Sequence, residues 1–214
     1  MAEKKRTFQD RREAGQVLAR DLARHRGRPD LLVLGLARGG VPIGWEVARE
    51  LRAPLDVCLV RKIGVPQWPE LAMGALTSGG GIVLNDDLLR SLGIADDALN
   101  DAIERETAEL QRREEAYRGD RGPLMLAGRT VILVDDGIAT GASMLAAVRA
   151  VRQAGAQRVI VGVPVGPASV CRRLREEADE VVCSTMPTDF RAVGQVFADF
   201  HQVSDDEVRE LLAG

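Results

Sequence analysis

Short apolar runs recur along the chain and are separated by charged or amphipathic stretches. Six of these runs, rich in β-branched residues, lie at 31–36, 55–60, 82–85, 130–135, 158–163 and 180–184. Continuous apolar runs of this length are typical of strands that are buried on both faces of a sheet. Segments with helical periodicity lie between them. The pattern therefore predicts an α/β fold, with a mainly parallel, twisted sheet flanked by helices.

The spacing of apolar residues predicts three of these helices, at 10–25, 96–118 and 141–154. Apolar residues fall four apart in the first of them, and Gly155 supplies a C-terminal stop for the last. The segment 96–118 carries one apolar stripe, and its other face has pairs of opposite charge four residues apart, Glu109/Arg113 and Glu114/Arg118. It is interpreted either as a solvated helix with one buried stripe or as a helix in a subunit contact.

The chain has 214 residues, of which 45% are hydrophobic and 29% are charged. This is enough apolar material for one sizeable core, so we interpret residues 1–214 as a single domain. The formal net charge of -3 lacks the basic excess of a nucleic-acid binder, and nucleic acid is not expected as a partner. The charged start and the strand-sized apolar runs predict no membrane segment and a cytoplasmic protein.

The cysteines and histidines give no sign of a metal centre. Cys58, Cys171 and Cys183 lie far apart and form no CxxC motif, which is typical of reduced structural cysteines. With only His25 and His201 besides, the sequence has no cluster with the ligand spacing of a zinc site. It also lacks the motifs of P-loop NTPases, dinucleotide-binding folds and nucleophile elbows.

The most informative segment is VILVDDGIATGAS, residues 131–143. A hydrophobic strand ends in Asp135 and Asp136, and a turn of small residues then leads into a helix. This order places the turn at the carboxyl edge of the sheet, where ligands bind in α/β folds. The small side chains leave the backbone of the turn uncovered, two hydroxyl groups can donate hydrogen bonds, and the start of the helix has free N–H groups. Together these features favour the binding of a phosphate. The candidate phosphate-binding residues are Gly137, Ile138, Ala139, Thr140, Gly141, Ala142 and Ser143.

The paired carboxylates need a different partner, because two aspartates would repel a phosphate. Carboxylates accept hydrogen bonds from hydroxyl groups and can hold Mg²⁺, directly or through water. A ligand with a phosphate at one end, vicinal hydroxyls in the middle and a metal nearby matches this arrangement, as a ribose 5-phosphate does. The alternative from the residues alone is an acid pair at a strand end that caps the next helix.

The segment resembles the motif with which type I phosphoribosyltransferases bind 5-phosphoribosyl 1-pyrophosphate (PRPP). The similarity covers about residues 31–184 and is greatest to uncharacterised stand-alone bacterial members of the family. It implies Mg²⁺-dependent transfer of a 5-phosphoribosyl group from PRPP to a nitrogenous acceptor, usually a nucleobase, with release of pyrophosphate. By this resemblance residues 137–143 bind the 5-phosphate. Asp135 and Asp136 are catalytic, holding the ribose hydroxyls and, through these or water, the Mg²⁺.

Two further segments fit the same resemblance at the pyrophosphate end. Arg38, Gly39 and Gly40 follow the first strand, where the family's pyrophosphate loop often contains a cis peptide, here at Arg38–Gly39 or its neighbour. Arg61 and Lys62 follow the second strand and resemble the basic pair that stabilises departing pyrophosphate, which makes them candidate catalytic residues. The alternative is a solvated basic pair at a strand end. The stretch 64–81 matches the family's flexible loop.

The acceptor site of the family lies under a small variable hood, which we expect to come from the N-terminal and C-terminal segments. Phe190 and Val193 are the candidate acceptor-binding residues, although buried core phenylalanines are the alternative interpretation of the C-terminal aromatics. Ala139 stands where oxopurine-specific members carry an acid, which disfavours a 6-oxopurine acceptor.

The resemblance also bears on assembly and on the class of function. Family members are commonly dimers, so a homodimer is expected. Two other functions stay open: a PRPP-binding regulator or sensor, and a receiver-type phosphorylation pocket built on Asp135 and Asp136.

Overall fold

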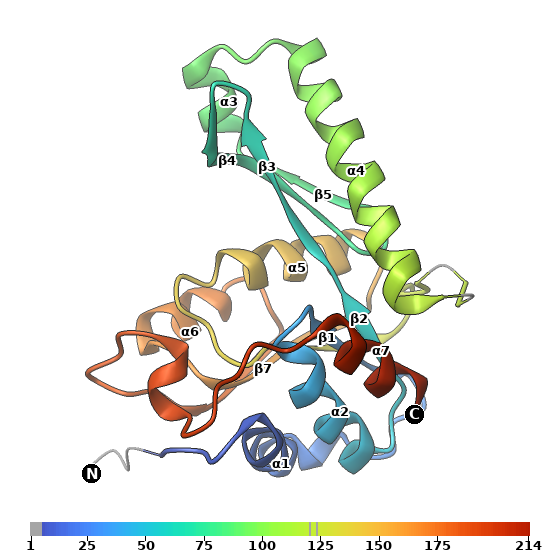
Figure 1. Cartoon of the computed structure of the whole chain (residues 1–214), viewed down its shortest axis with the longest axis vertical. Helices are drawn as coiled ribbons and strands as arrows, with labels where there is room; N and C mark the ends of the chain where they lie inside the picture. The colour runs from blue at the N-terminus through green and yellow to red at the C-terminus, as the bar shows by residue number, and fades with distance from the viewer. Residues whose placement is uncertain (1–5, 120, 123) are drawn as a thin grey trace.

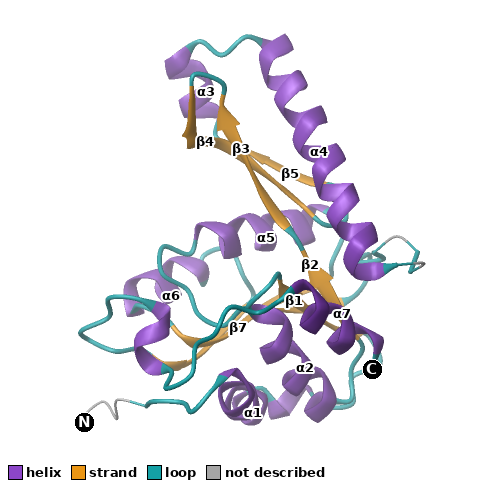
Figure 2. Cartoon of the chain, in the orientation of Figure 1, coloured by secondary structure: helices purple, strands orange, loops and turns teal. Residues whose placement is uncertain are grey.

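The computed structural model describes residues 6–119, 121–122 and 124–214. Its central sheet has five parallel strands in the order β2-β1-β6-β7-β8 (Figure 2). These strands are β1 (Leu31–Leu36), β2 (Leu55–Cys58), β6 (Thr130–Val134), β7 (Arg158–Val165) and β8 (Glu180–Thr185). The predicted α/β fold with a parallel sheet flanked by helices is confirmed.

Helices cover both faces of this sheet (Figure 1). The helices α1 (Arg11–Asp21) and α2 (Gly40–Leu51) lie on one face, and α5 (Ala142–Gln153) and α6 (Ala168–Leu174) lie on the other. Side chains alternate along each strand, so Leu31 and Val33 pack with α1 and α2, whereas Leu32 and Leu34 pack with α5 and α6. Both faces are therefore apolar, which explains why the strands read as continuous hydrophobic runs.

An arm projects from this α/β body (Figure 1). It consists of the antiparallel strands β3 (Val60–Val65), β4 (Trp68–Thr77) and β5 (Gly81–Leu84), followed by α3 (Asp86–Leu92) and α4 (Asp96–Arg118). The run at 82–85, predicted as a strand of the parallel sheet, pairs here as β5. Short turns join β3, β4 and β5, and strands joined without a crossover helix pair antiparallel. Residues 64–81, predicted as a loop, are mostly strand.

The long helix α4 has the predicted apolar stripe, with Ala102 and Leu110 buried against the arm's core. The predicted pair of Glu109 with Arg113 is present, with 2.8 Å between Oε1 and Nε. The predicted Glu114/Arg118 pair is wrong, because Arg118 Nε donates to Asp56 Oδ1 of β2 at 3.0 Å instead. That bond fastens the end of the arm to the central sheet.

A segment near the N-terminus pairs with the segment that precedes α7, beside α1. Phe8 forms a parallel bridge with Phe197, and the Phe8 amide donates to the Val196 carbonyl at 2.7 Å. The short 3₁₀ helices η1 (Ala23–His25) and η2 (Val193–Val196) and the final helix α7 (Asp205–Ala213) complete the fold, with α7 contacting both α2 and α4. Among the described residues no helix is long and apolar enough to cross a membrane.

Candidate active site

The turn after β6 is open to solvent at the carboxyl edge of the sheet. Gly137 and Ile138 are buried, whereas Ala139, Thr140, Ala142 and Ser143 are exposed. Gly141 caps α5 with a φ of 76°, a left-handed conformation that favours glycine. The predicted strand, turn and helix start are therefore all present, and the outer part of the turn is accessible to a ligand.

Backbone N–H groups of this turn are available to a ligand. The Ile138 amide donates to the Val165 carbonyl at 2.9 Å, which ties the base of the turn to β7. Within the described part of the chain, the amides of Ala139, Thr140, Gly141 and Ser143 have no hydrogen-bond acceptor. Free amides at the start of a helix attract anions, because the helix dipole adds partial positive charge there. The turn can thus bind a phosphate without a lysine.

Arg173 of α6, which sequence reasoning missed, holds this turn from behind. Its Nη2 donates to the Thr140 carbonyl. Because the peptide unit is planar and trans, a fixed Thr140 carbonyl directs the N–H of Gly141 to the opposite side. Arg173 therefore sets the direction of one of the free donors. Sequence spacing gives no signal for this contact, since the two residues lie 33 positions apart.

Arg173→Ala is expected to weaken phosphate binding at this turn about tenfold. The variant frees the Thr140–Gly141 peptide to rotate, which weakens one N–H donor; a charge-assisted hydrogen bond contributes on the order of 1.5–3 kcal/mol. Calorimetric titration with ribose 5-phosphate checks this, with the exposed neighbour Arg172→Ala as the control that removes the same charge. Equal dissociation constants of the two variants would contradict this role of Arg173.

Asp136 is already paired within the protein, again with a residue that the sequence did not indicate. Arg11 of α1 donates to Asp136 Oδ2 through Nε at 2.9 Å and through Nη2 at 2.8 Å. The two side chains are only 8% and 14% exposed, so water screens the pair weakly. Arg11 also donates from Nη1 to the His201 carbonyl at 2.6 Å and lies 4.1 Å from the centre of the Phe200 ring. The first helix thereby neutralises one acid of the motif.

The loop after β1 packs directly against the acid pair. A Cβ placed on Gly39 would lie 2.1 Å from Asp136 Oδ2, and one on Gly40 would lie 2.3 Å from the Val134 carbonyl oxygen. Glycine is therefore required at both positions by close approach. The loop contains a cis peptide at Ala37–Arg38, the bond next to Arg38–Gly39. The structure brings Arg38, Gly39 and Gly40 together with Asp135 and Asp136.

The electrostatics of the acid pair favour a cation or hydroxyl donors. Asp135 is half-buried, and its Oδ1 accepts from the Asp136 amide at 2.9 Å. Burial, and then the neighbouring Asp136 carboxylate, raise the pKa of Asp135 well above its ordinary value. Burial also raises the pKa of Asp136, although Arg11 opposes this shift. When Asp135 is ionised, a cation or a hydroxyl donor beside it would therefore stabilise its carboxylate.

These residues fit a metal ion that takes most of its ligands from the substrate. Among the described residues no group of three or more His, Cys, Asp or Glu side chains could hold a metal. Within the described ranges Asp135 is the carboxylate of the pair that has no bond to a cationic side chain, because Arg11 binds Asp136. Mg²⁺ commonly binds through one or two carboxylates, water and substrate phosphates, and this donor set suits such a site.

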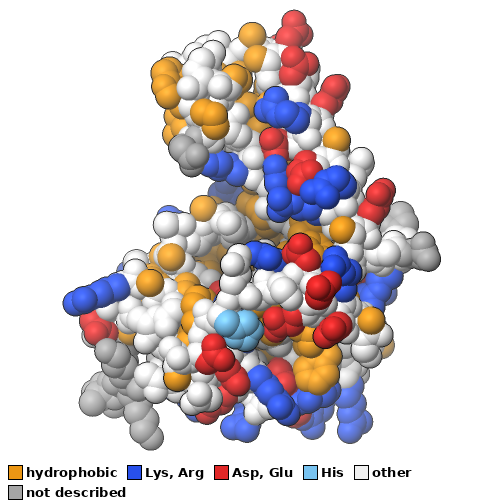
Figure 3. All heavy atoms as spheres, in the orientation of Figure 1, with side chains coloured by type: hydrophobic (Ala, Val, Ile, Leu, Met, Phe, Trp, Pro, Cys, Tyr) orange, Lys and Arg blue, Asp and Glu red, His pale blue; other side chains and the backbone are white. Residues whose placement is uncertain are grey.

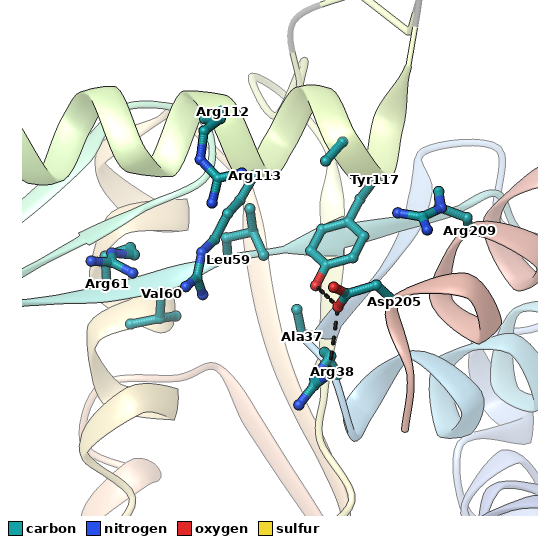
Figure 4. A pocket seen from close by; sticks show the side chains of 11 residues that line it. Ala37, Arg38, Leu59, Val60, Arg61, Arg112, Arg113, Tyr117, Asp205 and Arg209 are labelled. Atoms are coloured by element: carbon teal, nitrogen blue, oxygen red, sulfur yellow. Dashed lines mark hydrogen bonds and ion pairs between the residues drawn. The ribbon is translucent and has the colours of Figure 1, made fainter. Parts of the chain in front are cut away.

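The predicted basic residues divide between two neighbouring cavities. Arg38 and Arg61 line a pocket of about 360 Å³ between the arm and the body (Figure 4). Lys62 is exposed and lines an adjacent cavity of about 440 Å³, which it shares with Arg61. Arg61 Nε also donates to Glu106 Oε2 of α4 at 3.1 Å. Arg38 and Arg61 therefore line the same pocket, whereas Lys62 lies outside it. Figure 3 shows basic and acidic side chains gathered at this junction.

Of the two predicted acceptor-binding residues, Val193 contacts the base of the turn after β6. The Val193 side chain lies against Gly137, where an added Cβ would come within 2.5 Å of Val193 Cγ1. Phe190 packs against the core on the α1 and α2 side, and Phe197 and Phe200 stack with ring centres 4.9 Å apart. The structure therefore brings Val193 to the turn, whereas the phenylalanines pack against the core or against each other.

Comparisons with known proteins agree with this geometry. The family model described as "Phosphoribosyl transferase domain" matches residues 10–201. The chain is 50% identical over 206 residues to the Mycobacterium tuberculosis protein named "Putative phosphoribosyl transferase Rv0571c"; the match covers 96% of this chain and 46% of that protein. The chain therefore spans about half the length of the curated relatives it matches.

Two further matches cover different shares of the chain. The crystal structure of TT1426 from Thermus thermophilus superposes with a TM-score of 0.83 at 47% identity, covering 96% of this chain and 97% of that one. An adenine phosphoribosyltransferase from Marinobacter nauticus is 40% identical over 86 residues, which is 38% of this chain and 43% of that protein. The resemblance noted in the sequence is confirmed, and the chain belongs to the phosphoribosyl transferase domain family.

Proposed function

We propose that the protein transfers a 5-phosphoribosyl group from PRPP to a nitrogenous acceptor, a nucleobase, in a Mg²⁺-dependent reaction that releases pyrophosphate. One observation supports the proposal: β6 is followed by an acid pair and an open turn of free amides, directly against the glycines of the Arg38–Gly40 loop. The free amides, the two carboxylates and the loop with Arg38 lie along one edge of the sheet, as binding of PRPP requires. The corresponding proposal for the whole protein is a cytoplasmic homodimer.

Each part has a distinct role in this reaction. Loss of a leaving group from the anomeric carbon passes through an oxocarbenium-like transition state, as in glycoside cleavage. The turn 137–143 holds the 5-phosphate, and Asp135 and Asp136 place negative charge and hydrogen-bond acceptors beside the ribose. Arg38 and Arg61, with Lys62 at the edge of the adjacent cavity, stabilise the departing pyrophosphate. Mg²⁺ held near Asp135 and Asp136 would supply further neutralisation of the pyrophosphate oxygens.

A second candidate function is a PRPP-binding regulator with little catalysis. The observation that favours it is the internal pairing of two residues assigned to the chemistry. Asp136 is bound by Arg11, and Arg61 by Glu106. A protein that binds PRPP without catalysing its reaction has no need to break these two ion pairs. Pyrophosphate release decides between the two functions.

Ser143→Glu is expected to abolish measurable PRPP binding without lowering the melting temperature. Ser143 is exposed in the first turn of α5, where an acid interacts favourably with the helix dipole but repels a phosphate. Isothermal titration calorimetry with PRPP and Mg²⁺ measures the loss. Ser143→Gln is the matched control, since a glutamine side chain has nearly the same shape as a glutamate side chain but carries no charge. Equal affinities of the two variants would overturn the phosphate assignment.

A pyrophosphate-release assay with a panel of bases tests the enzymatic proposal. Adenine comes first in the panel, because of the 40% identity over 86 residues to an adenine phosphoribosyltransferase and because Ala139 replaces the acid of oxopurine-specific members. Release with one base establishes the acceptor. Binding of PRPP without release for any base would favour the regulator.

A further inference from the structure

The pocket between the arm and the body is lined by more arginines than the motif resemblance assigns. Its volume of about 360 Å³ falls within the range of about 300–1,000 Å³ for small-ligand sites. Arg38 reaches it from the loop after β1 and Arg61 from β3, and further arginines come from α4 and α7 (Figure 4). The lining arginines are Arg38, Arg61, Arg112, Arg113 and Arg209, and Asp205 is the one acid among the described residues that lines the pocket with them. Acids just outside the lining, Glu106, Glu109 and Asp206, pair with four of these arginines, so a compact polyanion would bind to the N–H donors that these pairs leave available.

Of the two arginines from α4, Arg113 has the donors to spare. Arg112 is 68% exposed in its side chain and holds both oxygens of Glu109, at 2.8 and 2.9 Å. Arg113 donates only its Nε to Glu109, at 2.8 Å, and its terminal Nη groups have no acceptor among the described residues. Figure 4 shows the Arg113 side chain extending from α4 towards Val60. Glu109 thus fixes the stem and leaves the guanidinium end available.

We propose that Arg113 binds the pyrophosphate group of PRPP together with Arg38 and Arg61, so that α4 of the arm forms one wall of the active site. This inference rests on the proposed function and adds an element outside the PRPP motif to it. Three guanidinium groups reach one pocket, from the loop after β1, from β3 and from α4. Guanidinium groups bind phosphate oxygens through paired N–H donors, and such charge-assisted bonds are the strong ones.

Asp205 lies against one of these three guanidinium groups, that of Arg38. Its carboxylate accepts from the Tyr117 hydroxyl at 2.6 Å and lies 3.5 Å from Arg38 Nη1 (Figure 4). The carboxylate therefore lies close to the position that an incoming phosphate oxygen must take. Pyrophosphate has to displace it or tolerate its charge. Arg113 and Asp205 should thus affect pyrophosphate affinity in opposite directions.

The test measures the two halves of PRPP separately. Calorimetry with inorganic pyrophosphate, with and without Mg²⁺, should show Arg113→Ala weakening binding about 10- to 100-fold. Asp205→Asn should tighten binding several-fold, by the removal of a like charge. Ribose 5-phosphate should bind both variants as it binds the wild type. Arg90→Ala, an exposed arginine of α3 on the same arm, is the charge-matched control.

Failures of the two proposals are distinguishable in this design. If pyrophosphate affinity is unchanged in Arg113→Ala, or falls in Asp205→Asn, the pocket is not the pyrophosphate site. Ribose 5-phosphate binding that depends on Ser143 would still support the proposed function in that case. Absence of binding by both halves would remove the proposed function itself. A tighter complex in Asp205→Asn also excludes misfolding as the reason for a loss in Arg113→Ala.

Discussion

Arg11→Met should lower the free energy of unfolding by about 3 kcal/mol or more, the range found when one partner of a buried ion pair is removed. The variant keeps an apolar side chain on α1 but leaves the Asp136 carboxylate with no cation. That carboxylate is 14% exposed and lies beside a second acid, so water offsets little of the loss. Urea denaturation at neutral pH measures the change, and the effect should exceed the roughly 0–1 kcal/mol of an exposed pair.

A double-mutant cycle separates the ion pair from packing. Asp136→Asn on its own leaves a buried guanidinium, which still binds the His201 carbonyl at 2.6 Å. In combination with Arg11→Met it removes both charges, and much of the lost stability should return. A loss below about 1 kcal/mol for Arg11→Met, or strictly additive effects, would show that the pair contributes no more than a surface contact. Arg12→Met, whose side chain is 72% exposed on the same helix, is the control.

Asp135→Asn should reduce turnover by about 100-fold or more while raising the melting temperature at neutral pH. Loss of one group that stabilises developing charge typically costs about 10²–10³ in rate. Stability should increase, because burial and the neighbouring Asp136 destabilise the charge of the aspartate, and the asparagine side chain carries no charge. Each kcal/mol gained corresponds to about 2–4 °C for a chain of this size.

The pH dependence gives the sign of this effect. The pKa of Asp135 in the folded protein lies above its ordinary value of 3.8, so the folded state holds the proton more tightly than the unfolded chain. The wild type therefore loses stability, relative to Asp135→Asn, as the pH rises from 3.8 through the folded-state pKa. Melting curves of both proteins from about pH 3 to 8 should nearly coincide at the acid end and diverge towards neutrality. A difference that is independent of pH would contradict the shift.

The sequence was informative where the site is built from consecutive residues. The strand β6, the acid pair, the turn 137–143 and the start of α5 follow one another along the chain, so local pattern alone predicted their arrangement. The run at 82–85 was misplaced because a short apolar run has the same appearance in a parallel and an antiparallel sheet. Only the connections between strands decide the pairing, and those connections belong to the arm.

The contacts that balance charge in the site could not be predicted in the same way. Arg11 and Asp136 are separated by 125 positions, and Arg173 and Thr140 by 33. Each of these arginines lies on a helix where a solvated side chain would give the same local pattern. Arg118 shows the reverse error, since its neighbour Glu114 satisfied the helical rule while Asp56, 62 positions away, holds the bond. A contact between residues far apart in the sequence, unlike one set by helical spacing, cannot be recognised from the local sequence pattern.

The pairing of residue 8 with residue 197 beside α1 has a consequence for biosynthesis. Asp136, which follows β6, gains its counterion from residue 11, and that arginine is in turn held by the backbone of residue 201 and the ring of residue 200. During translation α1 leaves the ribosome long before residues 200 and 201 are available to contact Arg11. We expect the edge of the sheet that is proposed to bind PRPP to form only after residue 201 has left the ribosome, and arrested chains that end before residue 200 should bind ribose 5-phosphate more weakly.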